Sequence, residues 1–164
     1  MSMKRIAPKA GQESVWDYPR PPRVEPVSKR ITIVFNGETI VDTTNAKRVL
    51  ETSHPPSYYI PPEDIRQDVL TMERRTTVCE FKGSAHYYSL ELNGQQSHNV
   101  AWAYSAPRAG FESIRDHLAF YPSRVDACFV DGEQVQTQEG DFYGGWITKN
   151  IVGPFKGGPG TWGW

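Results

Sequence analysis

The sequence predicts a mainly β fold, an antiparallel barrel or sandwich of about six to eight strands with two or three short connecting helices. Three turn pairs carry this prediction: Asn36-Gly37, Asn93-Gly94 and Asp131-Gly132, each of which lies between runs of alternating apolar residues. Such pairs accept the positive φ angles of a type I′ turn, whose twist matches the two strands it joins. Three hairpins require at least six strands.

The 164 residues are expected to form one domain with two attached ends. Residues 1–27 are rich in proline, which disfavours a helix, so we expect an extended arm there. Residues 28–152 contain the strand signals and are expected to form a single mainly β domain. Residues 153–164 are rich in glycine yet include Trp162 and Trp164, which indicates a tail that packs on the domain or on a partner.

Two segments have the apolar spacing of short helices. Residues 43–53 place Ala46, Val49 and Leu50 at i, i+3 and i+4, after a threonine that can cap a helix. Residues 110–122 repeat this pattern before a proline. A smaller helical turn is expected in residues 61–70, where proline leads and acidic residues follow.

The turn at Asn93-Gly94 fixes a testable strand register. A two-residue loop places four pairs opposite one another: Leu92–Gln95, Leu90–Ser97, Tyr88–Asn99 and His86–Ala101. Alternation then puts His86 and Tyr88 on one face, and Tyr87 on the other face with Val100, Trp102 and Tyr104. A β-bulge would change this assignment.

Charge and apolar pattern exclude several classes of partner. The formal net charge is -1, so the chain lacks the positive field of a general nucleic-acid or anionic-membrane binder. No apolar run approaches the roughly 18 residues of a membrane span. Cys79 and Cys128 have no paired spacing and the four histidines have no metal-ligand spacing. We therefore expect a cytoplasmic protein with reduced thiols, or a single disulfide as the alternative, and with no metal, cofactor, nucleic acid or membrane as partner.

The stretch ETSHPPSYYIPPED at residues 51–64 predicts a binding site. Its prolines restrict the φ angles, so Tyr58 and Tyr59 point to opposite faces if the chain is extended, and we expect only one of them to meet the face of His86. Polar-tipped rings in stiff segments supply contact area at low entropic cost. With nearby cations they give nine candidate ligand-binding residues: Arg48, His54, Tyr58, Tyr59, Lys82, His86, Tyr88, Trp102 and Tyr121.

These residues predict binding of a small polar molecule in a cleft lined by aromatic side chains and histidine, with catalysis left open. If the protein is an enzyme, the candidate catalytic groups are His86, His54 and Tyr88, because imidazole titrates nearest neutral pH and a phenol can donate a proton. No reaction class follows. The alternative is an interaction or assembly module whose arm and tail contact a partner or a second copy, giving a homodimer. Each ring also has a purely structural interpretation as part of the core.

Four pieces of the chain resemble a known family when taken in order: RVLETSHPPSYYIPPEDIRQDVL, CEFKGSAHYYSL, AWAYSAP and AFYPSRVD. They are similar to a bacterial family known as domain of unknown function 427, over about residues 28–135. The resemblance implies a compact mainly β domain, sometimes given a nucleotidyltransferase-like label, and carries no activity with it. Nucleotidyl transfer normally requires clustered carboxylates for magnesium, and the sequence has no Gly-Ser pair followed by D-x-D.

Overall fold

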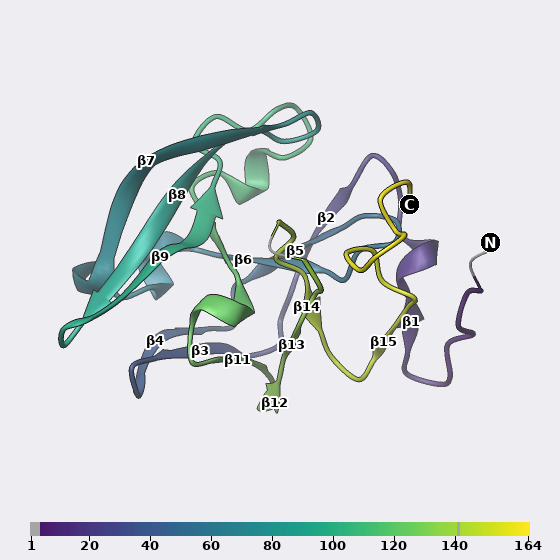
Figure 1. Ribbon diagram of the computed structural model, residues 1–164, viewed down its shortest axis with the longest axis horizontal. Coiled ribbons are helices and arrows are strands. Elements are labelled where there is room, and N and C mark those ends of the chain that lie inside the picture. Colours follow the sequence, from purple (N-terminus) through teal and green to yellow (C-terminus); the bar gives the residue numbers. More distant parts are fainter. Residues whose placement is uncertain (1–3, 141) are drawn as a thin grey trace.

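The computed structural model describes residues 4–140 and 142–164 and confirms the mainly β fold. The larger sheet has seven strands, in spatial order β2 (Arg23–Pro26), β5 (Lys47–Leu50), β6 (Ser57–Ile60), β10 (Leu118–Phe120), β9 (Gln95–Ala103), β8 (Gly83–Leu92) and β7 (Leu70–Cys79). The smaller sheet has four, in the order β12 (Glu133–Gln134), β11 (Ala127–Val130), β3 (Ile31–Phe35) and β4 (Glu38–Thr43) (Figure 1). The larger sheet ends in β2 and β7, so the described strands form no closed barrel.

Short elements complete the part of the chain that the structure describes. Two further strand pairs are β1 (Glu13–Ser14) with β15 (Ile151–Val152), and β13 (Gln136–Thr137) with β14 (Trp146–Ile147). The helical elements are 3-10 turns: η1 (Val15–Asp17), η2 (Pro62–Asp64), η3 (Gln67–Val69), η4 (Glu112–Ile114) and η5 (Pro122–Arg124). The helical turn expected in residues 61–70 is present as η2 and η3. In the described residues no helix is long and apolar enough to cross a membrane.

All three predicted hairpin turns are present. They join β3 to β4, β8 to β9 and β11 to β12. Both central residues have positive φ angles in each turn, for example 50° at Asn36 and 76° at Gly37. This is the type I′ geometry for which Asn-Gly and Asp-Gly pairs are suited.

Two segments predicted to be helices are mostly strand or extended chain. Within residues 43–53 the structure has β5, in which Val49 and Leu50 are buried in different hydrophobic clusters. Within residues 110–122 a single 3-10 turn precedes β10, whose three residues are all buried. A strand buried on both faces is apolar at consecutive positions, and this mimicked the apolar spacing of a helix.

The central strands of the seven-stranded sheet are buried on both faces, whereas its edge strands β2 and β7 contain no buried residue. Its inner face shares a hydrophobic core with the four-stranded sheet. This core contains Ile33 of β3, Ile60 of β6 and Phe120 of β10. Its outer face carries a second cluster that includes Tyr59 and Trp102. Because side chains alternate along a strand, the neighbours Tyr59 and Ile60 enter different clusters. The outer cluster surrounds the candidate site.

The β8–β9 hairpin follows the predicted register only near its turn. Two pairs match the prediction, Leu92–Gln95 and Leu90–Ser97. The other two predicted pairs are wrong, and the structure has Tyr88–Ala101 and His86–Ala103 instead. The cause is a bulge in β9 around Asn99, whose φ angle is 52°. The bulge places Val100 in the inner core, whereas it was expected on the face of Trp102.

The two ends of the chain lie on the same side of the molecule (Figure 1). The arm supplies the edge strand β2, and its Glu13 forms an ion pair with Arg48. In the tail, the Trp164 ring meets Trp16 edge-on with 5.4 Å between ring centroids. The indole nitrogen of Trp16 donates a hydrogen bond to the main-chain oxygen of Pro154. The division into arm, domain and tail stays a prediction.

Candidate functional site

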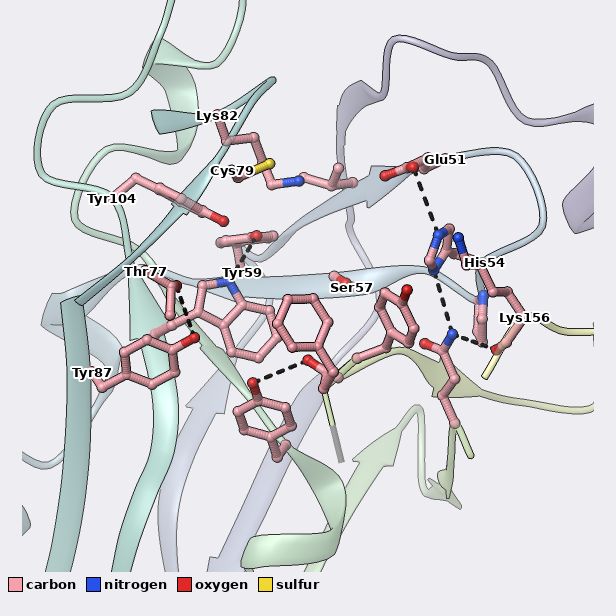
Figure 2. Close-up of a pocket in the computed structure, with 18 of the residues that line it drawn as sticks. Glu51, His54, Ser57, Tyr59, Thr77, Cys79, Lys82, Tyr87, Tyr104 and Lys156 are labelled. Atoms are coloured by element: carbon pink, nitrogen blue, oxygen red, sulfur yellow. Dashed lines mark hydrogen bonds and ion pairs between the residues drawn. The ribbon is translucent and has the colours of Figure 1, made fainter. Parts of the chain in front are cut away.

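A cavity of about 280 Å³ lies on the outer face of the seven-stranded sheet. Figure 2 shows Glu51 and His54 at one end of it and Thr77 and Tyr87 at the other. The strands of the sheet supply the floor, and the segment after β13 supplies part of the wall. The cavity therefore has a charged end and an aromatic end.

The rings of the floor come from neighbouring strands. In β10, Ala119 pairs with Tyr59 of β6 on one side and with Trp102 of β9 on the other. The Trp102 indole nitrogen donates a hydrogen bond to the Tyr59 hydroxyl at 3.2 Å, so the two side chains meet across Ala119, which is buried beneath them. Tyr121 extends the floor, with its ring centroid 4.8 Å from that of Trp102. The positions of Tyr59 and Trp102 are therefore fixed by strand register and not by a flexible loop.

Tyrosine hydroxyls line the aromatic end. The Tyr87 hydroxyl lies 3.0 Å from Oγ1 of Thr77, and the Tyr121 hydroxyl donates to the main-chain oxygen of Phe142 at 3.2 Å. Burial raises the pKa of Tyr59 and of Tyr121, so these phenols are neutral and serve as hydrogen-bonding groups at physiological pH. This end can therefore contact a ring and also a polar substituent on it.

Two residues of opposite charge line the cavity: Lys82 lies beside Cys79 and Tyr104, and Glu51 lies farther along, beside His54 (Figure 2). Lys82 follows β7, and its main-chain oxygen accepts a hydrogen bond from the Arg108 amide at 3.0 Å. Burial opposes the charge on the Lys82 amine, but neighbouring acidic groups, foremost Tyr59 and then Cys79 and Glu51, outweigh it and raise its pKa. Lys82 is therefore a cation at neutral pH. It can hold an anion, whereas a nucleophilic amine would need a lowered pKa.

His54 is held as a neutral imidazole. Burial, and then the positive charges of Lys156, Arg20 and Lys82, lower its pKa to about 4. The amide of Gln138 sets its tautomer, because Oε1 of Gln138 accepts from the Gly145 amide and Nε2 donates to the Lys156 main-chain oxygen. Nε2 of Gln138 therefore also faces Nδ1 of His54, at 3.4 Å, and the ring proton lies on the other nitrogen, Nε2. That nitrogen points to Glu51, 3.6 Å away.

The structure brings together five of the nine predicted ligand-binding residues. The five that line the cavity are His54, Tyr59, Lys82, Trp102 and Tyr121. Of the three candidate catalytic residues, His54 alone is among them.

The other four predicted residues lie elsewhere. Arg48 bonds to Glu13 and Glu25 beside the arm. Tyr58 stacks on Trp146 in the inner core, at 4.8 Å between centroids. Tyr88 packs against that core, and His86 alternates with Tyr87 on β8, away from the cavity. Of the two adjacent tyrosines, Tyr59 thus faces the cavity and Tyr58 the opposite side of the sheet, the side of Tyr88.

Sequence reasoning missed the wall that the C-terminal segment provides. Gln138, Phe142, Tyr143 and Lys156 all line the cavity, and the Tyr143 ring meets the His54 ring edge-on at 4.9 Å. Gln138 is only 2% exposed although it lies in no regular element. The aromatic pair Phe142-Tyr143, followed by two glycines, was the available signal. Among the described residues, no group of three or more His, Cys, Asp or Glu side chains is placed to hold a metal ion.

The cavity extends beyond the part of the chain that comparison with other proteins identifies. The sequence model of one protein family matches residues 23–131, which is more than half of the chain. The floor and the charged groups Glu51 and Lys82 lie within this match, whereas Gln138 and Lys156 follow it. Comparison with the curated proteins found no match. The chain belongs to the family described as Domain of unknown function (DUF427).

Proposed function

We propose that the cavity binds a small molecule that has a flat ring and a polar end. The observation that carries this proposal is the cavity of about 280 Å³ lined by the rings of Tyr59, Trp102 and Tyr121. A core that served only packing would fill such a space, because protein interiors are close-packed. The cavity is small for a ligand site, which suits a molecule with one or two fused rings.

The aromatic end supports a ring as one part of the ligand. Trp102 and Tyr121 lie with their planes 54° apart, so a ring can stack on one and meet the edge of the other. Phe142 lines the same cavity and remains 68% exposed. An exposed phenyl ring beside a hollow gains buried apolar area when a ring enters.

The polar end supports a hydrogen-bonding or charged group as the other part. The side chains of Lys82 and Glu51 and the neutral imidazole of His54 all line the cavity. A small number of polar groups around an apolar floor is typical of sites that orient a small molecule.

The features of His54 favour binding over catalysis. Its pKa of about 4 and its fixed tautomer make it a poor proton donor or acceptor near neutral pH, where a catalytic imidazole operates best. The nucleotidyltransferase label would require carboxylates arranged around magnesium. The described residues contain no such group, and we assign no nucleotidyl transfer step to the cavity.

An experiment that fills the cavity tests the proposal. Two-dimensional NMR of the labelled full-length chain, screened with single-ring and two-ring compounds, should give shifts at the amides of Tyr59, Trp102 and Tyr121. Ser57→Leu enlarges a side chain that lines the cavity and should abolish these shifts. Tyr88→Phe changes the opposite face of the sheet and should preserve them. Binding that is unchanged in a folded Ser57→Leu protein would refute the proposed site.

A second candidate function, assembly through the terminal segments, is favoured by one observation. Trp162 is 89% exposed, although Trp164, two residues later, packs on Trp16. An exposed tryptophan of this kind is typical of an interface anchor. Light scattering over a range of concentrations should then show a dimer that Trp162→Ser dissociates, and a monomer at every concentration would contradict this role.

A further inference from the structure

We infer that the polar end of the ligand is a singly charged acid group, a carboxylate that the Lys82 amine binds. This inference rests on the proposed function and adds the chemical class of the ligand to it. The ligand is thus an aryl carboxylic acid whose ring lies on Trp102 and Tyr121 and whose carboxylate lies at the Lys82 side chain, which Figure 2 shows beside Cys79.

The charges that line the cavity are unbalanced. Glu51 contributes one negative charge, whereas Lys82 and Lys156 contribute two positive charges. Glu51 already has a cation beside it, since its Oε2 lies 3.4 Å from Nε of Arg20. The Lys156 amine donates to an oxygen of Trp164. In the described part of the chain, Lys82 forms no ion pair with a carboxylate side chain. A ligand that brings one negative charge therefore balances Lys82.

Of the two lysines, Lys82 is the better placed to bind the acid. The Lys156 amine is engaged with the tail: it donates to the main-chain oxygen of Trp164 at 3.2 Å and lies 5.7 Å from the Tyr143 ring centroid. The Lys82 side chain lies beside Cys79 (Figure 2). Its main-chain oxygen accepts a hydrogen bond from the Arg108 amide, which fixes the backbone from which the side chain extends. A poorly solvated cation that lacks a carboxylate is a strong site for one.

Glu51 limits the acid to a single charge. Its carboxylate is near enough to Lys82 to raise the pKa of that amine, so a second negative charge on the ligand would be repelled by Glu51. Arg20 beside Glu51 reduces this repulsion, whereas the neutral His54 adds no further positive charge. We therefore expect a carboxylate to bind better than a phosphate monoester on the same ring.

Three probes share one naphthalene ring system and differ in the head group: 2-naphthylacetic acid, its primary amide and 2-naphthylmethyl phosphate. Comparing them separates the contribution of the head group from that of the ring system. Isothermal titration of the full-length protein at neutral pH and low salt should show that the acid binds about tenfold or more tightly than the amide. This is the gain in affinity expected of a charge-assisted hydrogen bond. The phosphate should bind no more tightly than the acid. Added salt should weaken the binding of the acid and leave the binding of the amide unchanged. This comparison tests the role of charge without any substitution.

Variants locate the charge. Lys82→Met keeps the apolar stem of the side chain and should remove the preference for the acid. Lys156→Met should reduce it less. Lys149→Met makes the same change of net charge at an exposed position outside the cavity and should leave the preference intact.

The outcomes distinguish the two proposals. Equal binding of acid and amide at the cavity overturns the carboxylate inference and leaves the proposed function standing. A phosphate that binds tenfold more tightly than the acid overturns the limit to one charge. Failure of all three probes to bind counts against both the proposed function and the inference that rests on it.

Discussion

The depressed pKa of His54 predicts a specific loss of stability in mild acid. In the folded protein the imidazole stays neutral down to about pH 4, because it is buried and lies among the positive charges of Lys156, Arg20 and Lys82. In the unfolded chain its pKa returns to about 6.5. Between these two values the unfolded state binds the proton and the folded state does not.

The sign and size of the effect follow from this difference. Above about pH 6.5 the proton equilibrium of His54 does not lower the free energy of unfolding. That free energy then decreases as the pH falls from about 6.5 to about 4, and His54 causes no further decrease below about pH 4. At about 1.36 kcal/mol per pH unit, the free energy of unfolding should decrease by about 3 kcal/mol across the window. The side chain is only 14% exposed, so solvent screening removes little of this amount.

Urea denaturation of the parent and of His54→Gln between about pH 7 and pH 4 measures the effect. The stability difference between the two proteins should shrink by about 3 kcal/mol over this range, because glutamine does not titrate. NMR titration of the His54 ring gives the pKa directly, and a midpoint near 6.5 would refute the argument.

Two further substitutions test the packing around the site. Gly144→Ala should cost about 1–3 kcal/mol and weaken ligand binding, because an added methyl group would overlap the Trp102 ring, whereas Gly163→Ala has nothing within 4 Å and should change neither denaturation midpoint nor affinity. Trp146→Phe should cost about 2–4 kcal/mol in urea denaturation, since Trp146 is fully buried and its indole nitrogen donates to the Phe120 main-chain oxygen at 2.9 Å. A loss below about 1 kcal/mol would show that this hydrogen bond and ring contribute little.

Local chemistry in the sequence was enough to place the hairpins. An Asn-Gly or Asp-Gly pair determines the backbone of its own turn, so each prediction depended on two residues only. The apolar spacing around Val49 and Leu50 was not enough, because β5 lies between β2 and β6 and is buried on both faces. Whether a strand lies in the centre of a sheet or at its edge depends on its pairing with strands that are distant in the sequence, and the sequence of one segment does not reveal this pairing.

The site residues divide in the same way. Tyr59 was a sound candidate because its prolines favour an extended strand, and alternation then requires Tyr58 to face the other side. His86 and Tyr88 were predicted site residues as well, but they lie on the other face of the sheet. The register near them depends on a bulge around Asn99, and a bulge follows from contacts across strands.

The division of the cavity into floor and wall has a consequence for specificity. The floor includes Tyr59 and Trp102, whose strands are held in place by hydrogen bonds to β10 between them. The polar end depends on Gln138, which has no strand to hold it and is fixed by hydrogen bonds to Gly145 and to the Lys156 main chain. A change of loop sequence can therefore alter the polar end without disturbing the sheet, whereas a change in the floor alters the fold as well. Ring preference should consequently be the more constant property of this cavity and head-group preference the more variable one.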